Sequence, residues 1–383
     1  MFDGIEMEKV ISLLKHIDKI YIFGAQSRAK TLMGYIRELA PSIRILGFLV
    51  DDEEQNEELI DGIPVYHMDS DSEYDVAAPV FLATKGLFHE KITEKLQKNG
   101  FAIICPISVE VDNTLRNAYV AKAFEKQHRE FMKIERLSYK EGKDGTVDNV
   151  IEKKTFVCVY VARSIYDKEL QTPYTYLGYE KDIQVGAALT VRRLKDVECL
   201  DCTGNNISIK NRQYCELTGL YWLWKNCHYD IVGLSHYRRH FILPDNWIET
   251  MVCEKIDVIL PVPTYVYPNI DENYRQRHIP DDWDYLLQYL RETDVNIYKA
   301  ALEAFAGNLY LPCNMFIAKW EVLDTLCSWM FPILDAVVEH GGIKEDIYMN
   351  RYAGFISERL ITLFFYINED KYKIAYADRI FLQ

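Results

Sequence analysis

The sequence predicts an α/β fold in two domains. Three observations support this prediction: apolar runs alternate with helical stretches in both parts of the chain, a polar segment separates the parts, and all six tryptophans follow that segment. A chain of 383 residues is also too long for one ordinary compact core. Hydrophobic residues make up 49% and charged residues 27% of the chain, which is typical of globular proteins and not of disordered ones.

The first domain is expected over residues 1–111. A helix is predicted over residues 28–39, and strands are predicted at residues 19–25, 43–52, 78–84 and 101–107. Strands separated by helical segments form a parallel sheet with helices on its faces. The pattern is that of a small Rossmann-like domain.

The turn after the first strand carries half of a dinucleotide-binding signal. Gly24 ends the strand, but Gln26 stands where a second glycine would let the backbone approach a pyrophosphate. Asp51 ends the second strand, where a ribose hydroxyl can be held. Two interpretations stay open, a ligand site at Gly24 and Asp51 or a structural or oligomerising domain.

Residues 112–153 are expected to connect the domains. Apolar residues recur near helical spacing from Asn113 to Lys140, which predicts a helix. The polar stretch from Glu141 to Asn149 contains two glycines and predicts a linker.

The second domain is expected over residues 154–383. Continuous apolar runs, typical of buried parallel strands, occur at residues 156–162, 230–235 and 257–262. Helices are predicted at residues 214–226 and 351–367. The second domain is therefore α/β as well.

Charge and composition exclude several classes of protein. The formal net charge of −14 makes nucleic acid an unexpected partner. No apolar run reaches the roughly 18 residues of a membrane span, and the first ten residues lack the pattern of a secretory signal, so we expect a cytoplasmic protein. The nine cysteines are expected to be buried thiols: Cys199 and Cys202 form a C-x-x-C, but no second close pair completes a zinc site.

Four segments of the second domain resemble a known family. They read DCTGNNISIKNRQYCELTGLYWLWKN, IVGLSHYRRHF, PCNMFIAKWEVLDTLCSWMFPIL and NRYAGFISERL. Together, and in this order, they resemble bacterial glycosyltransferases of capsule, exopolysaccharide and O-antigen synthesis, long catalogued as a domain of unknown function. The resemblance covers about residues 155–382. It implies a glycosyltransferase A-type (GT-A) fold and transfer of a hexose, galactose or galactofuranose, from a UDP-sugar. Through FGA, GFLVDD and DGIPVY, the first domain resembles the sugar-nucleotide-sensing domain of sugar O-acyltransferases.

A cluster of cations follows the strand IVGLS. Most GT-A enzymes place a metal-binding Asp-x-Asp motif after a central strand, whereas this chain has His236, Arg238 and Arg239 there. An imidazole and two guanidiniums can bind diphosphate oxygens directly, so we expect no requirement for a divalent metal. The alternative is that one arginine faces solvent and His236 fills a polar core position.

Polar residues before, on and after the helix predicted at residues 214–226 are expected to orient the donor. They are Asp201, Thr203, Asn205, Asn206, Glu216 and Asn314. The family more often has Asp at the position of Asn205. The alternatives are a helix-capping loop for the first four, an ion pair with an arginine for Glu216 and a turn-stabilising role for Asn314.

An inverting transfer needs a base for the acceptor hydroxyl, and a carboxylate is the usual solution. Asp346, just before the last long helix, is the first choice, and Glu358, on that helix, is the second. The alternatives are a helix N-terminal charge for Asp346 and an ion pair with Arg359 or Arg351 for Glu358.

The leading hypothesis is a glycosyltransferase that uses a nucleotide sugar and an oligosaccharide or lipid-linked glycan acceptor. A catalytically inactive sugar-nucleotide-binding regulator is the alternative from another class. An NAD-dependent sugar-modifying enzyme is a third hypothesis, which Gln26 weakens. Peripheral contact with the inner face of the cell membrane and oligomerisation stay open.

Overall fold

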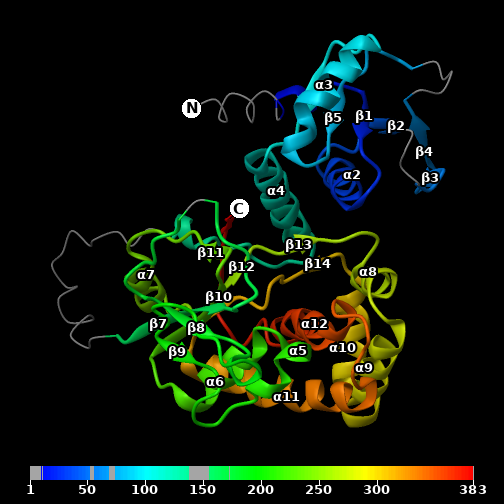
Figure 1. Cartoon of the computed structure of the whole chain (residues 1–383). Coiled ribbons are helices and arrows are strands. Elements are labelled where there is room, and N and C mark those ends of the chain that lie inside the picture. Colours follow the sequence, from blue (N-terminus) through cyan, green and yellow to red (C-terminus); the bar gives the residue numbers. More distant parts are fainter. Residues whose placement is uncertain are drawn as a thin grey trace. The chain divides into compact units, whose positions relative to one another are not determined.

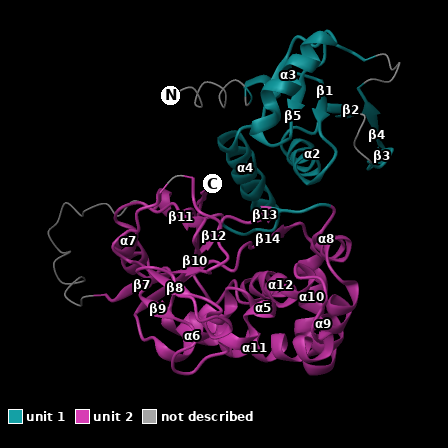
Figure 2. Cartoon of the chain, in the orientation of Figure 1, with its two compact units in different colours: residues 1–130, 265–267 teal, residues 131–264, 268–383 magenta. Residues whose placement is uncertain are grey.

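The structure, a computed structural model, describes residues 10, 12–51, 56–68, 74–137, 155–171 and 173–382. The chain forms two compact units (Figure 2). Unit 1 comprises Met1–Glu130 and Tyr265–Tyr267, and unit 2 comprises Phe131–Thr264 and Pro268–Gln383.

Unit 1 is built around a six-stranded sheet in the order β3-β4-β2-β1-β5-β6. All neighbouring strands are parallel except β3 and β4. The strands are β1 (Lys19–Phe23), β2 (Arg44–Val50), β3 (Leu59–Ile60), β4 (Ile63–His67), β5 (Val80–Leu82) and β6 (Ile104–Pro106). The helices are α2 (Ser27–Leu39), α3 (His89–Lys98) and α4 (Val109–Lys126). The predicted alternation of parallel strands and helices is confirmed in this unit (Figure 1).

Unit 2 is built around a nine-stranded sheet, whose main path runs β16-β12-β15-β10-β7-β8-β9. Its strands are β7 (Val157–Arg163), β8 (Glu180–Gln184), β9 (Cys199–Leu200), β10 (Ile231–His236), β11 (Arg239–Phe241), β12 (Val258–Pro261), β15 (Phe316–Lys319), β16 (Ile374–Ala377) and β17 (Arg379–Phe381). Along the main path only β15 is antiparallel to its neighbours, β10 and β12. A separate pair joins β13 (Thr264–Tyr265) and β14 (Leu309–Tyr310).

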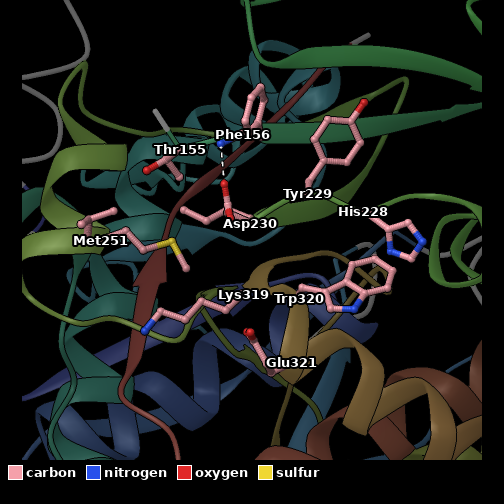
Figure 3. A pocket seen from close by; sticks show the side chains of 11 residues that line it. Thr155, Phe156, His228, Tyr229, Asp230, Met251, Lys319, Trp320 and Glu321 are labelled. Carbon is pink, nitrogen blue, oxygen red and sulfur yellow. Dashed lines mark hydrogen bonds between the residues drawn. The ribbon is translucent and has the colours of Figure 1, made fainter. Parts of the chain in front are cut away.

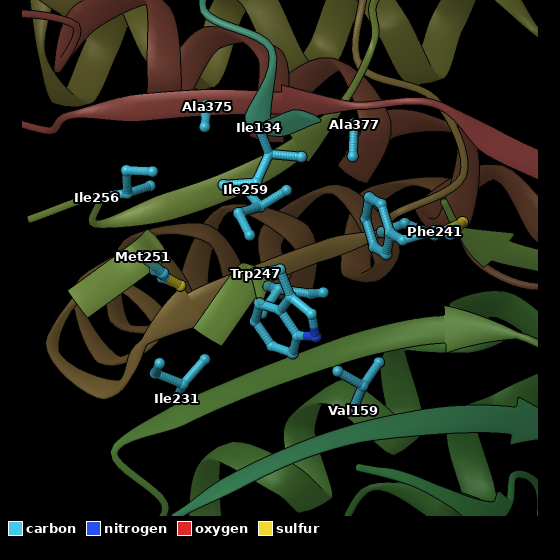
Figure 4. Close-up of a cluster of buried hydrophobic side chains, with 12 residues drawn as sticks. Ile134, Val159, Ile231, Phe241, Trp247, Met251, Ile256, Ile259, Ala375 and Ala377 are labelled. Atoms are coloured by element: carbon cyan, nitrogen blue, oxygen red, sulfur yellow. The ribbon is translucent and has the colours of Figure 1, made fainter. Parts of the chain in front are cut away.

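Helices cover both sides of the unit 2 sheet (Figure 1). They are α5 (Asn211–Tyr214), α6 (Leu217–Asn226), α7 (Trp247–Cys253), α8 (Ile270–Arg277), α9 (Pro280–Thr293), α10 (Val295–Ala306), α11 (Trp320–Gly341) and α12 (Tyr352–Ile367). Trp247 and Met251 of α7 pack with Val159, Ile231 and Ile259 of the sheet in one hydrophobic cluster (Figure 4). Burying such side chains stabilises the fold by about 1.5–3 kcal/mol each.

The helix predicted from Asn113 to Lys140 is shorter than expected. It ends at Lys126 because His128 adopts a left-handed conformation with φ 56°. The amides of His128 and Arg129 then donate to the carbonyls of Glu125 and Phe124, which is the hydrogen-bond pattern of a Schellman motif. The apolar residues beyond this point are not on the helix, and Ile134 packs instead in the cluster of unit 2. The predicted linker, residues 141–149, lies outside the described residues.

The single helix predicted over residues 214–226 is interrupted. Cys215 has a φ of 51°, and it separates α5 from α6. The Asn211 side-chain amide donates to the Cys215 carbonyl oxygen at 2.6 Å and to the Thr218 hydroxyl at 3.0 Å, which fixes the break. As a result Glu216 lies at the amino terminus of α6, outside the regular helix.

Candidate active site

The carboxyl ends of three neighbouring parallel strands meet at one edge of the unit 2 sheet. Strands β7, β8 and β10 end there at Arg163, Gln184 and His236. Because β15 runs antiparallel to β10, its start brings Cys313 and Asn314 to the same edge. Ligands of α/β proteins bind at the carboxyl ends of strands. We call Glu216, His236, Arg239, Cys313, Asn314 and Glu358 the edge cluster.

Asn314 holds the centre of the edge cluster. Its buried side-chain amide donates to Glu216 Oε1 at 2.7 Å and to the Gly354 carbonyl oxygen at 3.1 Å. The Ser357 hydroxyl donates to Asn314 Oδ1 at 2.8 Å. Cys313 and Asn314 have φ angles of 75° and 50°. Such backbone strain in residues other than glycine is concentrated at functional sites. The turn at Cys313 and Asn314 is therefore held by the hydrogen bonds of the Asn314 side chain and has a strained backbone.

His236 joins this turn to Glu216. Its Nε2 lies 2.7 Å from the Cys313 carbonyl oxygen and 3.6 Å from Glu216 Oε1. Because a carbonyl oxygen only accepts, Nε2 carries a proton and donates. Burial lowers the pKa of His236, the charge of Glu216 raises it, and the charge of Arg239 lowers it. The neutral ring then has no proton on Nδ1, so His236 can donate a hydrogen bond to a diphosphate from Nδ1 only after protonation.

Glu358 is the second carboxylate of the edge cluster. Its Oε1 accepts the Cys313 amide, and its Oε2 accepts Arg359 Nη1 at 2.8 Å. The ion pair with Arg359 is one of the alternatives that the sequence left open. The side chain keeps 16% of its surface exposed. Burial raises the pKa of Glu358, while the charge of Arg359 lowers it. An accessible carboxylate with a raised pKa suits general acid or base chemistry.

The two arginines of the HYRR sequence differ in their polar partners, although Arg239 also lies over the Phe381 ring, 5.3 Å from its centre. The charge of Arg239 acts on the pKa of both His236 and Glu358, so this guanidinium belongs to the edge cluster. Arg238 instead donates from Nε to the Leu382 carbonyl oxygen at 3.1 Å and lies 4.8 Å from the centre of the Phe381 ring. Within the sequence-predicted pair, Arg239 is therefore better placed to act on a ligand at this edge.

Two further cations near the edge cluster were not predicted as site residues. Arg351 Nε donates to Cys215 Sγ at 3.2 Å, and its charge lowers the pKa of His236. Arg379 acts in the same way on the pKa of Cys313. Arg379 reaches this region because β17 pairs with β11. No local sequence pattern indicates that pairing.

Asp201 is buried in a structural network. Its two carboxylate oxygens accept the amides of Gly186 and Ala187 at 2.8 and 3.0 Å and the hydroxyls of Ser208 and Thr218 at 2.5 and 2.6 Å. These bonds join the end of β8 to the segment before α5 and to α6. With four donors on one carboxylate, Asp201 acts here as an anchor between segments.

Of the other three residues of the predicted donor loop, Thr203 and Asn205 contact α6 and Asn206 bonds within the loop. The Thr203 hydroxyl accepts Trp222 Nε1 at 2.9 Å, and the backbone of Asn205 exchanges hydrogen bonds with the Asn226 side chain. Asn206 donates within the loop to the Cys202 and Gly204 carbonyl oxygens. Their contacts do not join the edge cluster, which favours the alternative of a structural loop.

Asp346 does not join the edge cluster either. Its side chain is exposed, and Oδ1 accepts the Met349 amide at 2.7 Å at the start of a short 3-10 turn. This is the helix-terminal role that the sequence left open as the alternative.

Neither Gly24 nor Asp51 lines the pocket found in unit 1. Gly24 follows β1 with a φ of 108°, and Asp51 Oδ1 accepts Lys95 Nζ at 2.8 Å. A cavity of about 330 Å³ follows Gly24 and is lined by Ala25, Gln26, Lys30, Asn56, Glu57 and Ile60. The Gln26 amide already donates to Asn56 Oδ1 at 2.8 Å. The proposed ligand site at this turn stays a prediction.

A larger cavity of about 480 Å³ lies at the other edge of the unit 2 sheet (Figure 3). Phe156, Asp230 and Ile231 of its lining stand at the amino ends of β7 and β10. Lys319 ends β15, and Trp320 follows it. Its position is therefore opposite to the edge cluster. Size alone does not make it the site, because the carboxylates and cations converge at the carboxyl edge.

The described residues offer neither a cluster of metal ligands nor a membrane span. They contain no group of three or more His, Cys, Asp or Glu side chains that could hold a metal ion. Across the same residues, no helix is long and apolar enough to cross a membrane. All nine cysteines are free: Cys105, Cys158, Cys227 and Cys327 are buried, and the other five are partly exposed.

Comparisons with known proteins address the family and the fold. A family model described as a domain of unknown function (DUF4422) matches residues 164–370, more than half of the chain. A solved structure described as "WbbM bifunctional glycosytransferase apo structure" is similar, with a TM-score of 0.51 and 23% sequence identity. The similarity covers 60% of this chain and 45% of that one, so the chain matches less than half of that protein. No curated protein matches the chain.

Proposed function

Since the chain belongs to the DUF4422 family, and its fold is similar to that of a solved bifunctional glycosyltransferase, we propose that it is a glycosyltransferase. The proposed reaction moves a hexose from a UDP-sugar to a growing glycan, and galactose and galactofuranose are the first sugars to test. The acceptor is proposed to be an oligosaccharide or a lipid-linked glycan at the inner face of the cell membrane.

One observation supports this proposal above the others. Two carboxylates, Glu216 and Glu358, and the guanidinium of Arg239 converge at the carboxyl edge of the unit 2 sheet. A departing UDP gains negative charge in the transition state, and a fixed guanidinium stabilises that charge. We therefore assign Arg239 to the diphosphate. Arg238 and His236 are less suited to bind the diphosphate. Arg238 already donates to the Leu382 carbonyl oxygen, and burial lowers the pKa of His236 and so favours its neutral form.

Glu358 is the proposed general base, in preference to Asp346. In an inverting transfer, Glu358 takes the proton of the acceptor hydroxyl while that oxygen forms a bond to the anomeric carbon. The bond between that carbon and the diphosphate oxygen breaks, and UDP leaves with its electron pair. Glu358 stands among the cations that a donor needs, whereas Asp346 is exposed and caps a turn. A base of raised pKa also works closer to neutral pH.

Glu216 and Asn314 are proposed to orient the donor sugar. Asn314 binds Glu216 Oε1 at 2.7 Å and holds that carboxylate at the edge of the sheet. Carboxylate oxygens accept hydrogen bonds from sugar hydroxyls. The turn at Asn314 then sets the distance between the donor sugar and Glu358, whose Oε1 is bound to the neighbouring Cys313 amide.

A donor screen tests this function against the alternative of a binding regulator. The purified chain is mixed with UDP-galactose, UDP-galactofuranose and other UDP-hexoses, with and without manganese. Thermal shift measures binding, since a ligand of the folded state raises its stability. UDP release measures turnover. A transferase binds one donor and releases UDP from it, whereas a regulator binds without release. Enzyme that neither binds nor turns over any UDP-hexose contradicts the proposal.

A further inference from the structure

One stripe of α12 stays open along a helix that is otherwise almost entirely buried. Arg351, just before the helix, and Phe355 and Glu358 within it keep part of their surface exposed, while most of their neighbours are buried. The spacings of four and three residues place them on one face. The proposed base therefore shares an accessible surface with an aromatic and a cationic side chain.

Two more aromatic rings extend this surface. His278 stacks on Phe355 with ring centres 4.2 Å apart and an angle of 22° between the planes. Tyr348 lies 5.0 Å from Phe355 and 6.1 Å from His278. We call His278, Tyr348 and Phe355 the aromatic shelf. Tyr348 keeps 51% of its surface exposed, so the shelf is not part of the core. Aromatic surface of this kind, left open beside a reactive group, marks a binding site.

The shelf offers apolar faces with a hydrogen-bonding edge. Burial lowers the pKa of His278 to about 3, so its ring is neutral at physiological pH. The Arg351 guanidinium lies 5.9 Å from the centre of the Phe355 ring. Among the described residues, its side-chain hydrogen bond to Cys215 uses Nε and leaves the two Nη groups out of that bond. The terminal Nη groups are therefore suited to donate to hydroxyls of a bound molecule.

These features match a pyranose ring. Such a ring has apolar C–H faces, which pack on aromatic side chains, and hydroxyls around its rim, which need hydrogen-bond partners. Phe355 of the shelf lies one turn before Glu358 on α12. The charge of Arg239, on β11, lowers the pKa of the same carboxylate. Since Arg239 is assigned to the donor diphosphate, the shelf is available for the second substrate.

We propose that the aromatic shelf is the acceptor subsite, which stacks a hexopyranose ring of the glycan and directs one of its hydroxyls to Glu358. This inference rests on the proposed transferase function. It assigns the terminal acceptor sugar, and not a lipid chain, to Tyr348 and Phe355. Arg351 holds hydroxyls of the same sugar.

The test compares shelf variants with a matched aromatic control. The shelf variants are Tyr348→Ala and Phe355→Leu, which keeps most of the ring's volume without its aromatic face. Tyr285→Ala is the control, because Tyr285 also stacks on a histidine, His340, at 3.9 Å. Methyl β-galactopyranoside and methyl β-glucopyranoside serve as acceptors. Steady-state kinetics give the KM of acceptor and donor, and acceptor-independent UDP release reports the donor site.

We expect both shelf variants to raise the acceptor KM about tenfold or more, with the donor KM and acceptor-independent UDP release within twofold of wild type. Tyr348→Phe should restore the acceptor KM, and Tyr285→Ala should leave it unchanged. An unchanged acceptor KM in both shelf variants overturns the inference, as does an equal rise in the control.

A binding measurement separates this inference from the proposed function. Saturation-transfer difference NMR of the two glycosides needs no turnover. Signals that are present with wild type and lost in both shelf variants support the subsite even if no UDP-hexose is turned over. Absent signals with wild type, or equal signals in wild type and variants, contradict the subsite while leaving UDP release to decide the function.

Discussion

At the scale of single residues, the edge cluster depends on a few side chains that each hold another in place. Asn314 fixes Glu216, the Cys313 amide fixes Glu358, and His236 bridges the Cys313 carbonyl and Glu216. Interactions that are already in place before the reaction cost no reorganisation during it. The following expectations distinguish the residues that act on substrate from those that support the fold.

Glu358→Gln should strongly reduce turnover while the chain stays folded. Removing a general base costs about 10²- to 10⁴-fold in rate. Burial raises the pKa of Glu358 in the folded chain, so its contribution to stability is present below the unfolded pKa and is lost as pH rises through the folded pKa. The neutral amide removes that pH dependence of stability. It also leaves the buried Arg359 without its carboxylate and places a donor against a donor, so we expect it to be less stable than wild type at neutral pH, as measured by thermal unfolding.

The pH profile of wild-type turnover checks the same assignment. Only the ionised carboxylate accepts a proton, so the rate should fall as pH drops through the raised pKa of Glu358. Residual turnover of Glu358→Gln should lack this acid limb. An acid limb that persists in the variant would show that another group is the base.

Arg239→Ala should impair transfer more than Arg238→Ala. A charge-assisted hydrogen bond contributes about 1.5–3 kcal/mol, which corresponds to a loss of roughly tenfold to more than 100-fold in kcat/KM. Arg238 is partly engaged by the Leu382 carbonyl oxygen, so its loss should matter less. The measurement is kcat/KM for the donor in both variants. A larger effect of Arg238→Ala would contradict the assignment.

Asp201→Asn should lower the stability of the second unit. We expect Asp201 to support the fold and not to act on substrate directly. The new amide group turns one acceptor into a donor that faces other donors, in a site that accepts four hydrogen bonds. We expect a loss of about 3 kcal/mol or more, measured by chemical denaturation. Asp196→Asn is the control, because Asp196 is exposed on a nearby loop. Equal stability of the two variants would show that Asp201 is no anchor.

At the scale of elements, the antiparallel strand β15 is what brings the edge cluster together. Its pairing with β10 sets Gly233 opposite Ile317 and Leu234 opposite Phe316, and the strained turn precedes Phe316. Helix α12 supplies Glu358 and Ser357 from the other side of that turn. The site therefore depends on the register of one strand pair and on the position of one helix.

Gly233→Ala should disturb that register. A Cβ at this position would lie 2.8 Å from the Phe316 carbonyl oxygen and 2.9 Å from Ile317 Cγ1, closer than real contacts allow. We expect a stability loss of about 1–3 kcal/mol and reduced turnover, because Phe316 adjoins the turn at Asn314. Gly178→Ala is the control, since a Cβ there meets nothing within 4 Å. Thermal unfolding and UDP release of both variants are the measurements.

The sequence predicts elements better than it predicts which of them meet. Apolar runs give the strands β1, β2, β7, β10 and β12 to within a few residues, because burial demands continuous apolar segments. The break at Cys215 escapes prediction, since it depends on Asn211, Thr218 and a left-handed backbone that apolar periodicity does not report. Helix periodicity likewise runs past Lys126, where a Schellman turn ends the helix.

The sequence predicted the residues of the candidate site better than their contacts. Glu216, His236, Arg239, Asn314 and Glu358 were all proposed from the sequence, and the structure brings them together. The predicted donor loop is bonded to α6, and polar composition does not tell such a loop from a ligand-binding one, so its role in donor binding stays a prediction. Arg379 carries no local signal, since only the pairing of β17 with β11 places it.

At the scale of the whole molecule, the second unit begins earlier than residue 154. Lys133 forms a buried ion pair with Asp378, and Met132 accepts the Tyr376 amide at 2.7 Å. Ile134 packs in the hydrophobic cluster of unit 2. Residues 131–137 thus contribute to the core that carries the edge cluster, although the sequence assigns them to the connection between domains.

Two fragments test how much of the chain this unit needs. A fragment of residues 131–383 should fold and retain turnover, because it keeps these contacts and every residue of the edge cluster. A fragment of residues 151–383 lacks Lys133 and Ile134, so it should unfold at a lower temperature. Thermal unfolding and UDP release of both are the measurements. Equal stability would place the boundary after residue 150, and a folded but inactive longer fragment would give unit 1 a part in catalysis.

The central claim, hexose transfer at the carboxyl edge of the unit 2 sheet, is tested most directly by the mass of the product. Wild type and Glu358→Gln are incubated with the best UDP-hexose and glycoside acceptor of the screens, and the acceptor is analysed by mass spectrometry. We expect wild type to add one hexose residue per UDP released, and Glu358→Gln to add hexose at least about 100-fold more slowly while still binding the donor. Donor binding by wild type with neither UDP release nor an elongated acceptor would contradict the account and favour a regulator.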